Sequence, residues 1–260
     1  MFDNIEIKED ERIDDLQLKG LKIIQNKNAF CYGIDSVLLS DFAKKIKDNS
    51  CVLDLGAGNG ILGLLLCGKI NLKSMVGIEI QEDVCQMANR SIRLNNLEDK
   101  NKVINGDIKK IADLIQKESF DAVVSNPPYK KENSGITNEC QTKLIARHEI
   151  LCDLDDIIKA AFYALKEKGA LYIIHRPERI VDLIDLMRKN RIEPKIVRFI
   201  QPNKDKKPNL VLVKGIKYGN SFVEVEKPLI VYNEDKTYTD EINKIYGINE
   251  GEKIWKEHCI

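Results

Sequence analysis

From about residue 50 onward, short apolar runs alternate with longer stretches in which apolar residues recur at helical spacing. This alternation is typical of βαβ units, in which helices connect buried parallel strands. The pattern predicts strands at 51–55, 75–80, 102–105, 121–125 and 169–174. It predicts helices at 60–69, 82–96, 108–117, 154–167 and 177–190, with Gly169 ending the helix before it. The predicted fold class is therefore α/β, with a doubly wound, mainly parallel sheet.

Two β-rich runs follow, Lys195–Ile200 and Leu210–Val213. The segment between them, Gln201–Pro208, is polar, basic and rich in turn-forming residues. It is too short to contain the crossover connection that a parallel pair of strands requires. The two runs are therefore predicted to form an antiparallel hairpin at the edge of the sheet.

The ends of the chain are predicted to be additions to one core and not separate domains. Residues 1–49 form an N-terminal extension, with a strand or hairpin within Asp14–Gln25 and a helix within Asp35–Lys47. The core spans 50–218, and the tail at 219–260 is expected to lie against it. Within the tail, Pro228–Tyr232 predicts one short strand, and residues 233–260 are left without a prediction.

The composition narrows the class of protein. A chain of 260 residues with 43% hydrophobic and 32% charged residues is ordinary for a globular enzyme. Lys+Arg and Asp+Glu both total 41, so any attraction to nucleic acid must come from local patches. We expect no membrane span and no signal peptide. The seven cysteines lack the close spacing of a metal site, which predicts reduced thiols in a cytoplasmic protein without a metal.

A glycine-rich turn connects the first predicted core strand to a helix. Gly56, Gly58 and Gly60 alternate there, and Asp54 precedes the first of them by two positions. Glycines allow a sharp turn and a close approach of a ligand to the backbone. The spacing differs from the dinucleotide fingerprint. A pyrophosphate prefers bare amides at a helix N-terminus, so the acidic residue suits a cationic or amino-bearing ligand.

Acidic residues also follow the next two strands. Glu79 ends the second strand, where a carboxylate accepts from both hydroxyls of a ribose in other nucleoside-binding sheets. The alternative for Glu79 is a solvated side chain. Asp107 follows the third strand and is placed to accept from an adenine amino group, or to cap the next helix, and both roles are compatible.

The fourth strand stops at Asn126-Pro127-Pro128-Tyr129. Two prolines cannot continue a strand, because proline fixes φ and lacks a donor. The tetrapeptide is therefore predicted to be a rigid corner at the carboxyl end of the strand, where open α/β sheets bind ligands. Its amide, carbonyls and aromatic ring suit a flat NH₂ group, either on a base or on a side-chain amide.

Taken together, Asp54 with the three glycines, Glu79, Asp107 and the tetrapeptide resemble the class I S-adenosylmethionine-dependent methyltransferases that methylate amino groups. Other segments resemble the bacterial valine-tRNA adenine-37 N6-methyltransferase family: Phe30–Leu39, Ala146–Glu149, His175–Arg179 and Pro208–Leu212. The resemblance implies a Rossmann-like sheet of seven strands with the last strand antiparallel. It also implies S-adenosylmethionine as the methyl donor and an adenine in a tRNA anticodon loop as the acceptor.

The resemblance also implies roles for individual residues. Asn126 and Pro127 would accept the two N–H groups of the target amine. Tyr129 would stack on the base, or alternatively be a packed aromatic at the rim. Asp35, in the segment Gly33–Ser36, would close over the methionine end of the cofactor or simply begin a helix.

Substrate contacts are expected next to the tetrapeptide, at Pro128, Lys130, Lys131 and Arg147. The basic residues there, and those at 176–179 and 204–207, either contact phosphates or are solvated. Three other functions remain open: methylation of a protein glutamine at N5, methylation of adenine N6 in DNA, and a cofactor-binding scaffold without activity.

Overall fold

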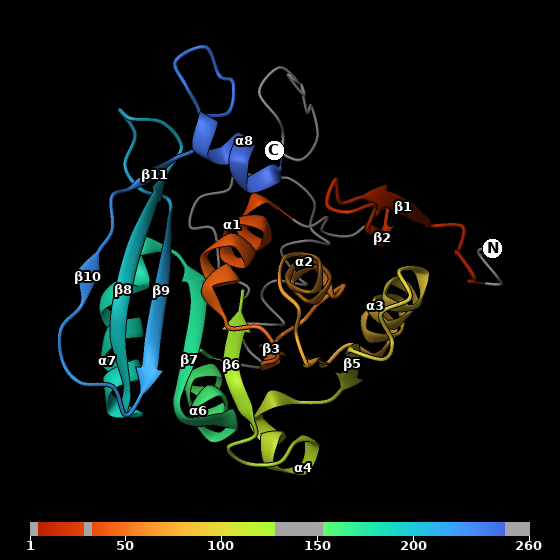
Figure 1. Cartoon of the computed structure of the whole chain (residues 1–260), viewed down its shortest axis with the longest axis horizontal. Helices are drawn as coiled ribbons and strands as arrows, with labels where there is room; N and C mark the ends of the chain where they lie inside the picture. Colours follow the sequence, from red (N-terminus) through yellow and green to blue (C-terminus); the bar gives the residue numbers. More distant parts are fainter. Residues whose placement is uncertain (1–4, 29–32, 128–152, 248–260) are drawn as a thin grey trace.

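The computed structural model describes residues 5–28, 33–127 and 153–247 (Figure 1). Within these ranges a sheet of nine strands has the order β10-β8-β9-β7-β6-β3-β4-β5, and β11 also pairs with β8. Its members are β3 (Cys51–Leu55), β4 (Ser74–Glu79), β5 (Asn101–Asn105), β6 (Phe120–Ser125), β7 (Leu165–His175), β8 (Ile192–Gln201), β9 (Leu210–Lys217), β10 (Glu224–Val225) and β11 (Leu229–Ile230).

The direction of the strands confirms the predicted doubly wound sheet. Neighbours from β7 through β6, β3 and β4 to β5 are all parallel. Strand β9 is antiparallel to both β7 and β8, as predicted for the last of seven strands. The hairpin of β8 and β9 is also confirmed. However, β10 and β11 pair with the outer side of β8 and extend the predicted seven strands to nine.

Helices cover both faces of the sheet. One face carries α4 (Ile111–Leu114), α6 (Leu154–Ala164) and α7 (Ile180–Lys189), and the other carries α1 (Ile34–Phe42), α2 (Ile61–Lys69), α3 (Glu82–Leu94) and α8 (Asp240–Tyr246). Short 3-10 turns lie at η1 (Ala43–Lys45), η2 (Ile108–Lys110) and η3 (Pro177–Arg179). Branched strand residues such as Val52 and Leu53 point to opposite faces and bury both layers. Among the described helices, none is long and apolar enough to cross a membrane.

Two helix predictions were wrong in length. The helix predicted at 154–167 ends at Ala164, and β7 begins at Leu165 instead of at Gly169. Leu165 pairs with Phe120 of β6, and a bulge follows before the regular pairing resumes at Ala170. The helix predicted at 108–117 is a 3-10 turn followed by one short helix that ends at Leu114.

Of the two alternatives predicted within Asp14–Gln25, a strand or a hairpin, the structure has a hairpin, which extends beyond both ends of that range and lies against α3. It consists of β1 (Glu11–Asp15) and β2 (Lys22–Asn26). Ser91 Oγ accepts from the Ile24 N–H at 2.9 Å, and Asn95 exchanges two hydrogen bonds with the Lys22 backbone. Arg90 forms a buried ion pair with Glu11 at 2.5 Å. Polar groups of α3 therefore satisfy the outer edge of β2.

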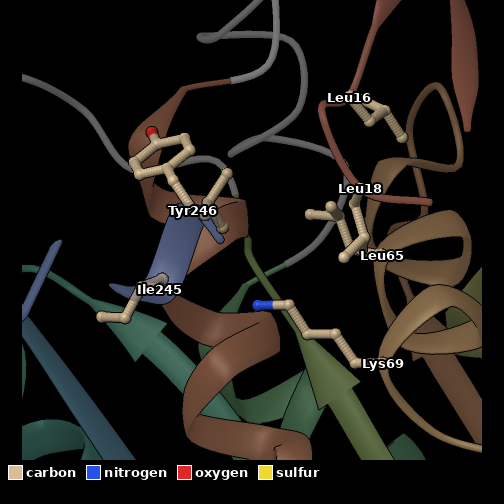
Figure 2. A pocket seen from close by; sticks show the side chains of 7 residues that line it. Leu16, Leu18, Leu65, Lys69, Ile245 and Tyr246 are labelled. Carbon is tan, nitrogen blue, oxygen red and sulfur yellow. The ribbon is translucent and has the colours of Figure 1, made fainter. Parts of the chain in front are cut away.

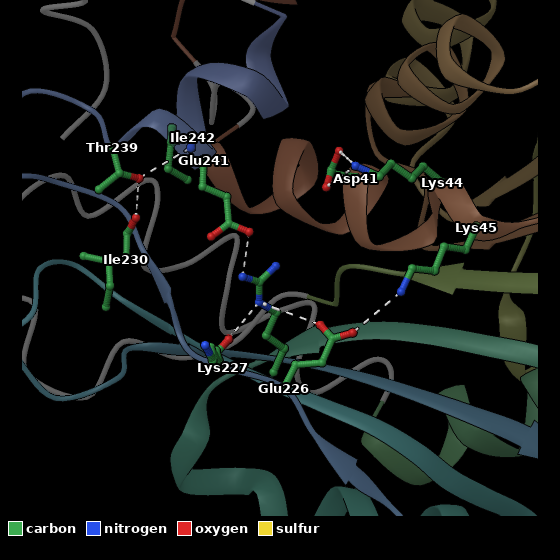
Figure 3. Close-up of polar contacts among 10 residues, drawn as sticks. Asp41, Lys44, Lys45, Glu226, Lys227, Ile230, Thr239, Glu241 and Ile242 are labelled. Carbon is green, nitrogen blue, oxygen red and sulfur yellow. Dashed lines mark hydrogen bonds and ion pairs between the residues drawn. The ribbon is translucent and has the colours of Figure 1, made fainter.

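Polar contacts connect residues 226–241 to the sheet (Figure 3). Arg198 of β8 lies 2.7 Å from Glu241 and 3.8 Å from Glu226, which also lies 3.7 Å from Lys45. Thr239 caps α8 and donates to the Ile230 carbonyl at 2.7 Å. The short strand predicted within Pro228–Tyr232 is confirmed as β11.

Candidate active site at the carboxyl edge of the sheet

The predicted site residues gather at one edge of the sheet. Asp54 lies near the end of β3, Glu79 ends β4, Asp107 follows β5 by two positions and Asn126 follows β6 directly. Because these four strands are parallel neighbours in the order β6-β3-β4-β5, their carboxyl ends lie side by side. This is the edge at which doubly wound sheets bind ligands.

The glycine turn after β3 opens toward solvent. Gly56 and Gly58 have φ of 78° and 54°, and a Cβ added to either would have no neighbour within 4 Å among the described residues. These residues therefore leave space for a ligand directly over this backbone. Gly60 differs, because its added Cβ would lie 3.2 Å from Ala88 of α3, which makes it a position of close helix packing.

The Glu79 side chain is hydrogen-bonded to the backbone of the glycine turn. This side chain is only 4% exposed, and its carboxylate accepts from the Gly58 N–H and from the Gln81 N–H, each at 2.9 Å. Asn105 at the end of β5 donates to the backbone carbonyls of Glu79 and Ile80, both at 3.0 Å. The Glu79 carboxylate is therefore held in place between the glycine turn and the start of α3.

Asp54 is the most unusual group at this edge. Its side chain is 1% exposed, and among the described residues neither carboxylate oxygen has a hydrogen-bond partner. Burial, and secondarily the charge of Glu79, raise the pKa of Asp54 to about 8. A buried carboxylate without partners is costly unless a ligand supplies a cation or N–H donors. The carboxylates at this edge therefore fit a nucleoside cofactor that carries an ammonium group.

Asp107 has the predicted capping role. It is half-buried, and its Oδ1 accepts from the Lys109 N–H at 2.9 Å at the start of η2. Because a carboxylate has further lone pairs, capping leaves Asp107 able to accept from a ligand.

Asn126 is joined to α1 by its side chain. Its Nδ2 donates to Ser36 Oγ at 3.2 Å, and it makes no other hydrogen bond within the described part of the chain. The preceding Ser125 donates from Oγ to the Leu55 carbonyl at 2.8 Å, which connects the end of β6 to the end of β3. Pro127 is buried. Among the described residues, no group donates a hydrogen bond to the amide oxygen of Asn126.

Asp35 lies beside Ser36 in the first turn of α1. The other predicted residues, Pro128, Tyr129, Lys130, Lys131 and Arg147, lie outside the described residues.

Sequence reasoning missed three contributors to this edge. Gln81 and Asn105 orient Glu79 and the turns beside it through the hydrogen bonds given above. Gly77, inside β4, lies against the glycine turn, because an added Cβ would be 2.7 Å from the Ala57 Cβ. A glycine within a strand signals a close approach of this kind, so Gly77 was detectable in Val76-Gly-Ile-Glu79.

Two cavities among the described residues lie away from this edge. One is a space of about 10 Å³ lined by Leu16, Leu65, Lys69 and Tyr246, with the Lys69 ammonium among apolar side chains (Figure 2). It has room for about one water molecule. The other, of about 430 Å³, lies beside the loops that lead into β4 and β5 and includes Asn71 and Lys100. The candidate site is thus an open edge and not one of these cavities.

The fold and the arrangement of edge residues define a class I methyltransferase. Solved structures agree in fold: a protein of Agrobacterium tumefaciens described as a predicted O-methyltransferase has a TM-score of 0.65 at 20% identity, covering 82% of this chain and 95% of its own. TYW2 of M. jannaschii, solved in complex with AdoMet, has a TM-score of 0.54 at 16% identity, covering 80% and 86%.

The model of the methyltransferase small domain matches residues 20–189. Two curated relatives are named tRNA1(Val) (adenine(37)-N6)-methyltransferase. One from Porphyromonas gingivalis is 30% identical over 175 residues, which is 65% of this chain and 68% of the relative. One from Flavobacterium johnsoniae is 30% identical over 158 residues, or 61% and 66%. The matched region thus spans about two thirds of these relatives.

The chain therefore belongs to the methyltransferase small domain family and, within it, to the tRNA1(Val) (adenine(37)-N6)-methyltransferase group. It is an S-adenosylmethionine-dependent methyltransferase.

Proposed function

We propose that this enzyme methylates the exocyclic N6 of an adenine in RNA, namely adenine 37 in the anticodon loop of a valine tRNA. The relatives named for that reaction support the choice of substrate. The observation that carries the chemistry is the Asn126 amide, a neutral acceptor at the end of β6 beside the glycine turn of β3.

The proposed chemistry follows from the weakness of the target nucleophile. The lone pair of an exocyclic amine is delocalised into the ring, so the planar nitrogen attacks poorly. Asn126 Oδ1 and the Pro127 carbonyl would accept its two N–H groups and favour the pyramidal nitrogen of the transition state. S-Adenosylmethionine supplies an electrophilic methyl group when bound. No strong base is needed before transfer, because the proton becomes acidic only afterwards.

The acidic residues at the carboxyl edge, Asp54, Glu79 and Asp107, are proposed to hold the cofactor. Glu79 would accept from the ribose hydroxyls, and Asp107 from the adenine amino group. The buried Asp54 carboxylate would gain a partner in the ammonium group of the methionine end. The open backbone at Gly56 and Gly58 would lie against the ligand, and Asp35 would close over the methionine end.

The RNA is proposed to be held by residues beyond Pro127. Tyr129 would stack on the target base, which a single-stranded loop can splay out, and Lys130, Lys131 and Arg147 would contact phosphates. The turn between β8 and β9 supports a second contact. Since β8 and β7 are both antiparallel to β9, this turn lies at the same edge as Asn126. Lys206 and Lys207 are exposed there and form no ion pair within the described residues.

The proposal is tested with unmodified RNA transcripts. The enzyme and labelled methyl donor are incubated with valine tRNA, with the same tRNA carrying guanine at position 37, with adenine-containing DNA and with a glutamine-containing protein fraction. We expect N6-methyladenosine in the first RNA and no label in the second. Label in DNA or protein instead would replace the proposed substrate. Label in the guanine variant would refute the position.

A further inference from the structure

The Asn126 side chain depends on a residue 90 positions earlier in the chain. Ser36 Oγ accepts from Asn126 Nδ2 at 3.2 Å, and this is the one hydrogen bond of Asn126 within the described ranges. Ser36 is 4% exposed, so water does not easily replace it. Among the described residues, this contact is the one that fixes the orientation of the amide plane.

The orientation of that plane decides what the amide offers to a substrate. With Nδ2 directed at Ser36, Oδ1 points the other way and can accept an N–H. With the amide rotated by half a turn, Nδ2 would confront the substrate amine with another donor. A serine hydroxyl can donate or accept, so Ser36 fixes the plane of the amide but not which of its two ends faces the serine. The substrate's N–H groups then select the orientation in which Oδ1 accepts.

Helix α1 gives Ser36 a fixed position. The helix begins after Gly33, and Ser36 lies in its first turn, followed by the buried residues Val37, Leu38 and Leu39. Leu38 and Leu39 belong to the apolar core between the sheet and this helix. The hydroxyl is therefore held by a packed element and not by a loop, which is the condition for orienting another side chain closely.

We infer that Ser36 is a positioning residue for methyl transfer, acting through the Asn126 amide and not through contact with substrate or cofactor. This inference rests on the proposed role of Asn126. In this inference, α1 orients Asn126 Oδ1, the proposed acceptor for the N–H groups of the target amine.

The kinetic test uses Ser36→Ala, with Ser40→Ala as a matched control. Ser40 is a fully buried serine one turn later in α1, and its Oγ donates to the Val37 carbonyl at 2.7 Å. Alanine favours helix, so both variants should fold. For Ser36→Ala we expect kcat lower by about three- to tenfold, the effect of one hydrogen bond, with unchanged Kd for S-adenosylmethionine. Ser40→Ala should leave kcat unchanged.

A second measurement does not depend on activity. In ¹⁵N-labelled protein, the side-chain NH₂ signal of Asn126, identified by its absence in Asn126→Asp, should shift in Ser36→Ala and stay in place in Ser40→Ala. An unchanged signal or an unchanged kcat in Ser36→Ala would overturn the inference. So would an equal loss of kcat in both serine variants.

The failure of the inference and that of the proposed function are distinguishable. Full turnover in Asn126→Ala would remove the proposed function itself. Loss of turnover in Asn126→Ala together with normal turnover in Ser36→Ala would remove only the role of Ser36.

Discussion

The ends of β3 and β4 carry buried carboxyl groups, whereas the described residues at the end of β6 carry neutral polar groups. The side chains of Asp54, at the end of β3, and Glu79, at the end of β4, are almost fully buried. At β6 the polar groups are the Asn126 amide and the hydroxyls of Ser36 and Ser125. The two regions are neighbours, because β3 pairs with both β4 and β6.

The difference matches what each region is proposed to bind. A cofactor with a permanent positive charge is well served by carboxylates, which bind cations strongly in a buried site. The target amine is neutral until the methyl group is transferred. An amide accepts its N–H groups and cannot take up a proton near neutral pH. Changes in pH should therefore alter cofactor binding more than the acceptor at β6.

The largest effect is expected from Asn126→Ala. We expect kcat to fall about 100-fold or more, because an acceptor used in the transition state is removed. Binding of S-adenosylmethionine, measured by calorimetry, should stay within about threefold. Asn105→Ala is the contrasting control at the end of β5: it loses the bonds to Glu79 and Ile80 and should lower cofactor affinity more than kcat. Equal loss of kcat in both variants would contradict the division between the two regions.

Asp54→Asn changes the region at the end of β3 and should alter cofactor affinity. The amide has nearly the same shape but no charge, so the ammonium of the cofactor loses an ionic partner. We expect its Kd to rise about 10- to 100-fold, the range for a hydrogen bond to a charged group. With saturating cofactor, kcat should change little. An unchanged Kd would show that Asp54 does not face the cofactor.

The raised pKa of Asp54, about 8, predicts how stability depends on pH. Between pH 4 and 8 the folded state keeps the proton while the unfolded state releases it, so stability falls as pH rises through this window. From pH 6 to pH 8 the loss should be up to about 2 kcal/mol for the cofactor-free enzyme. Urea unfolding at both values measures it, and Asp54→Asn should lack this part of the decrease. Identical pH dependence in wild type and variant would contradict the assignment.

The smallest effect is expected in the turn between β8 and β9. Reversing the charge of Lys206 and Lys207 should raise KM for tRNA by about three- to tenfold at low salt, with kcat unchanged. The slope of log affinity against log salt should become shallower by about 2. Lys117→Glu, exposed in the turn before β6 at the opposite edge, is the control. A similar effect in the control would point to overall charge and not to a contact.

The sequence could predict that the candidate residues lie at one edge of the sheet, because each of them lies next to a strand end. Asp54, Glu79, Asp107 and Asn126 are within two positions of a carboxyl terminus, and parallel strands bring these termini together. Local patterns could not reveal the bond between Ser36 and Asn126, which joins distant parts of the chain. Nor could they reveal that the Asp54 carboxylate has no hydrogen-bond partner in the described part of the chain, since this depends on every neighbour at once.

The boundary between α6 and β7 shows a different limit. The apolar spacing of Leu154–Leu165 is helical, and the following Lys166-Glu-Lys168 favours helix as well. In the structure Leu165 pairs with Phe120 at the start of β6, and Lys168 adopts a φ of 60° in the bulge that follows. Pairing with a neighbouring strand outweighs the local preference for helix, which is common at element ends.

The hairpin of β1 and β2 has a consequence for how the molecule opens. A two-stranded hairpin is marginally stable alone and usually exchanges its amide hydrogens quickly. Here the amide of Ile24 points away from β1 and donates to the buried hydroxyl of Ser91, so α3 stands in for a third strand. Deuterium exchange at the Ile24 amide should therefore be slow and should occur only when the core opens. The rate would then show whether the hairpin of β1 and β2 unfolds together with the core.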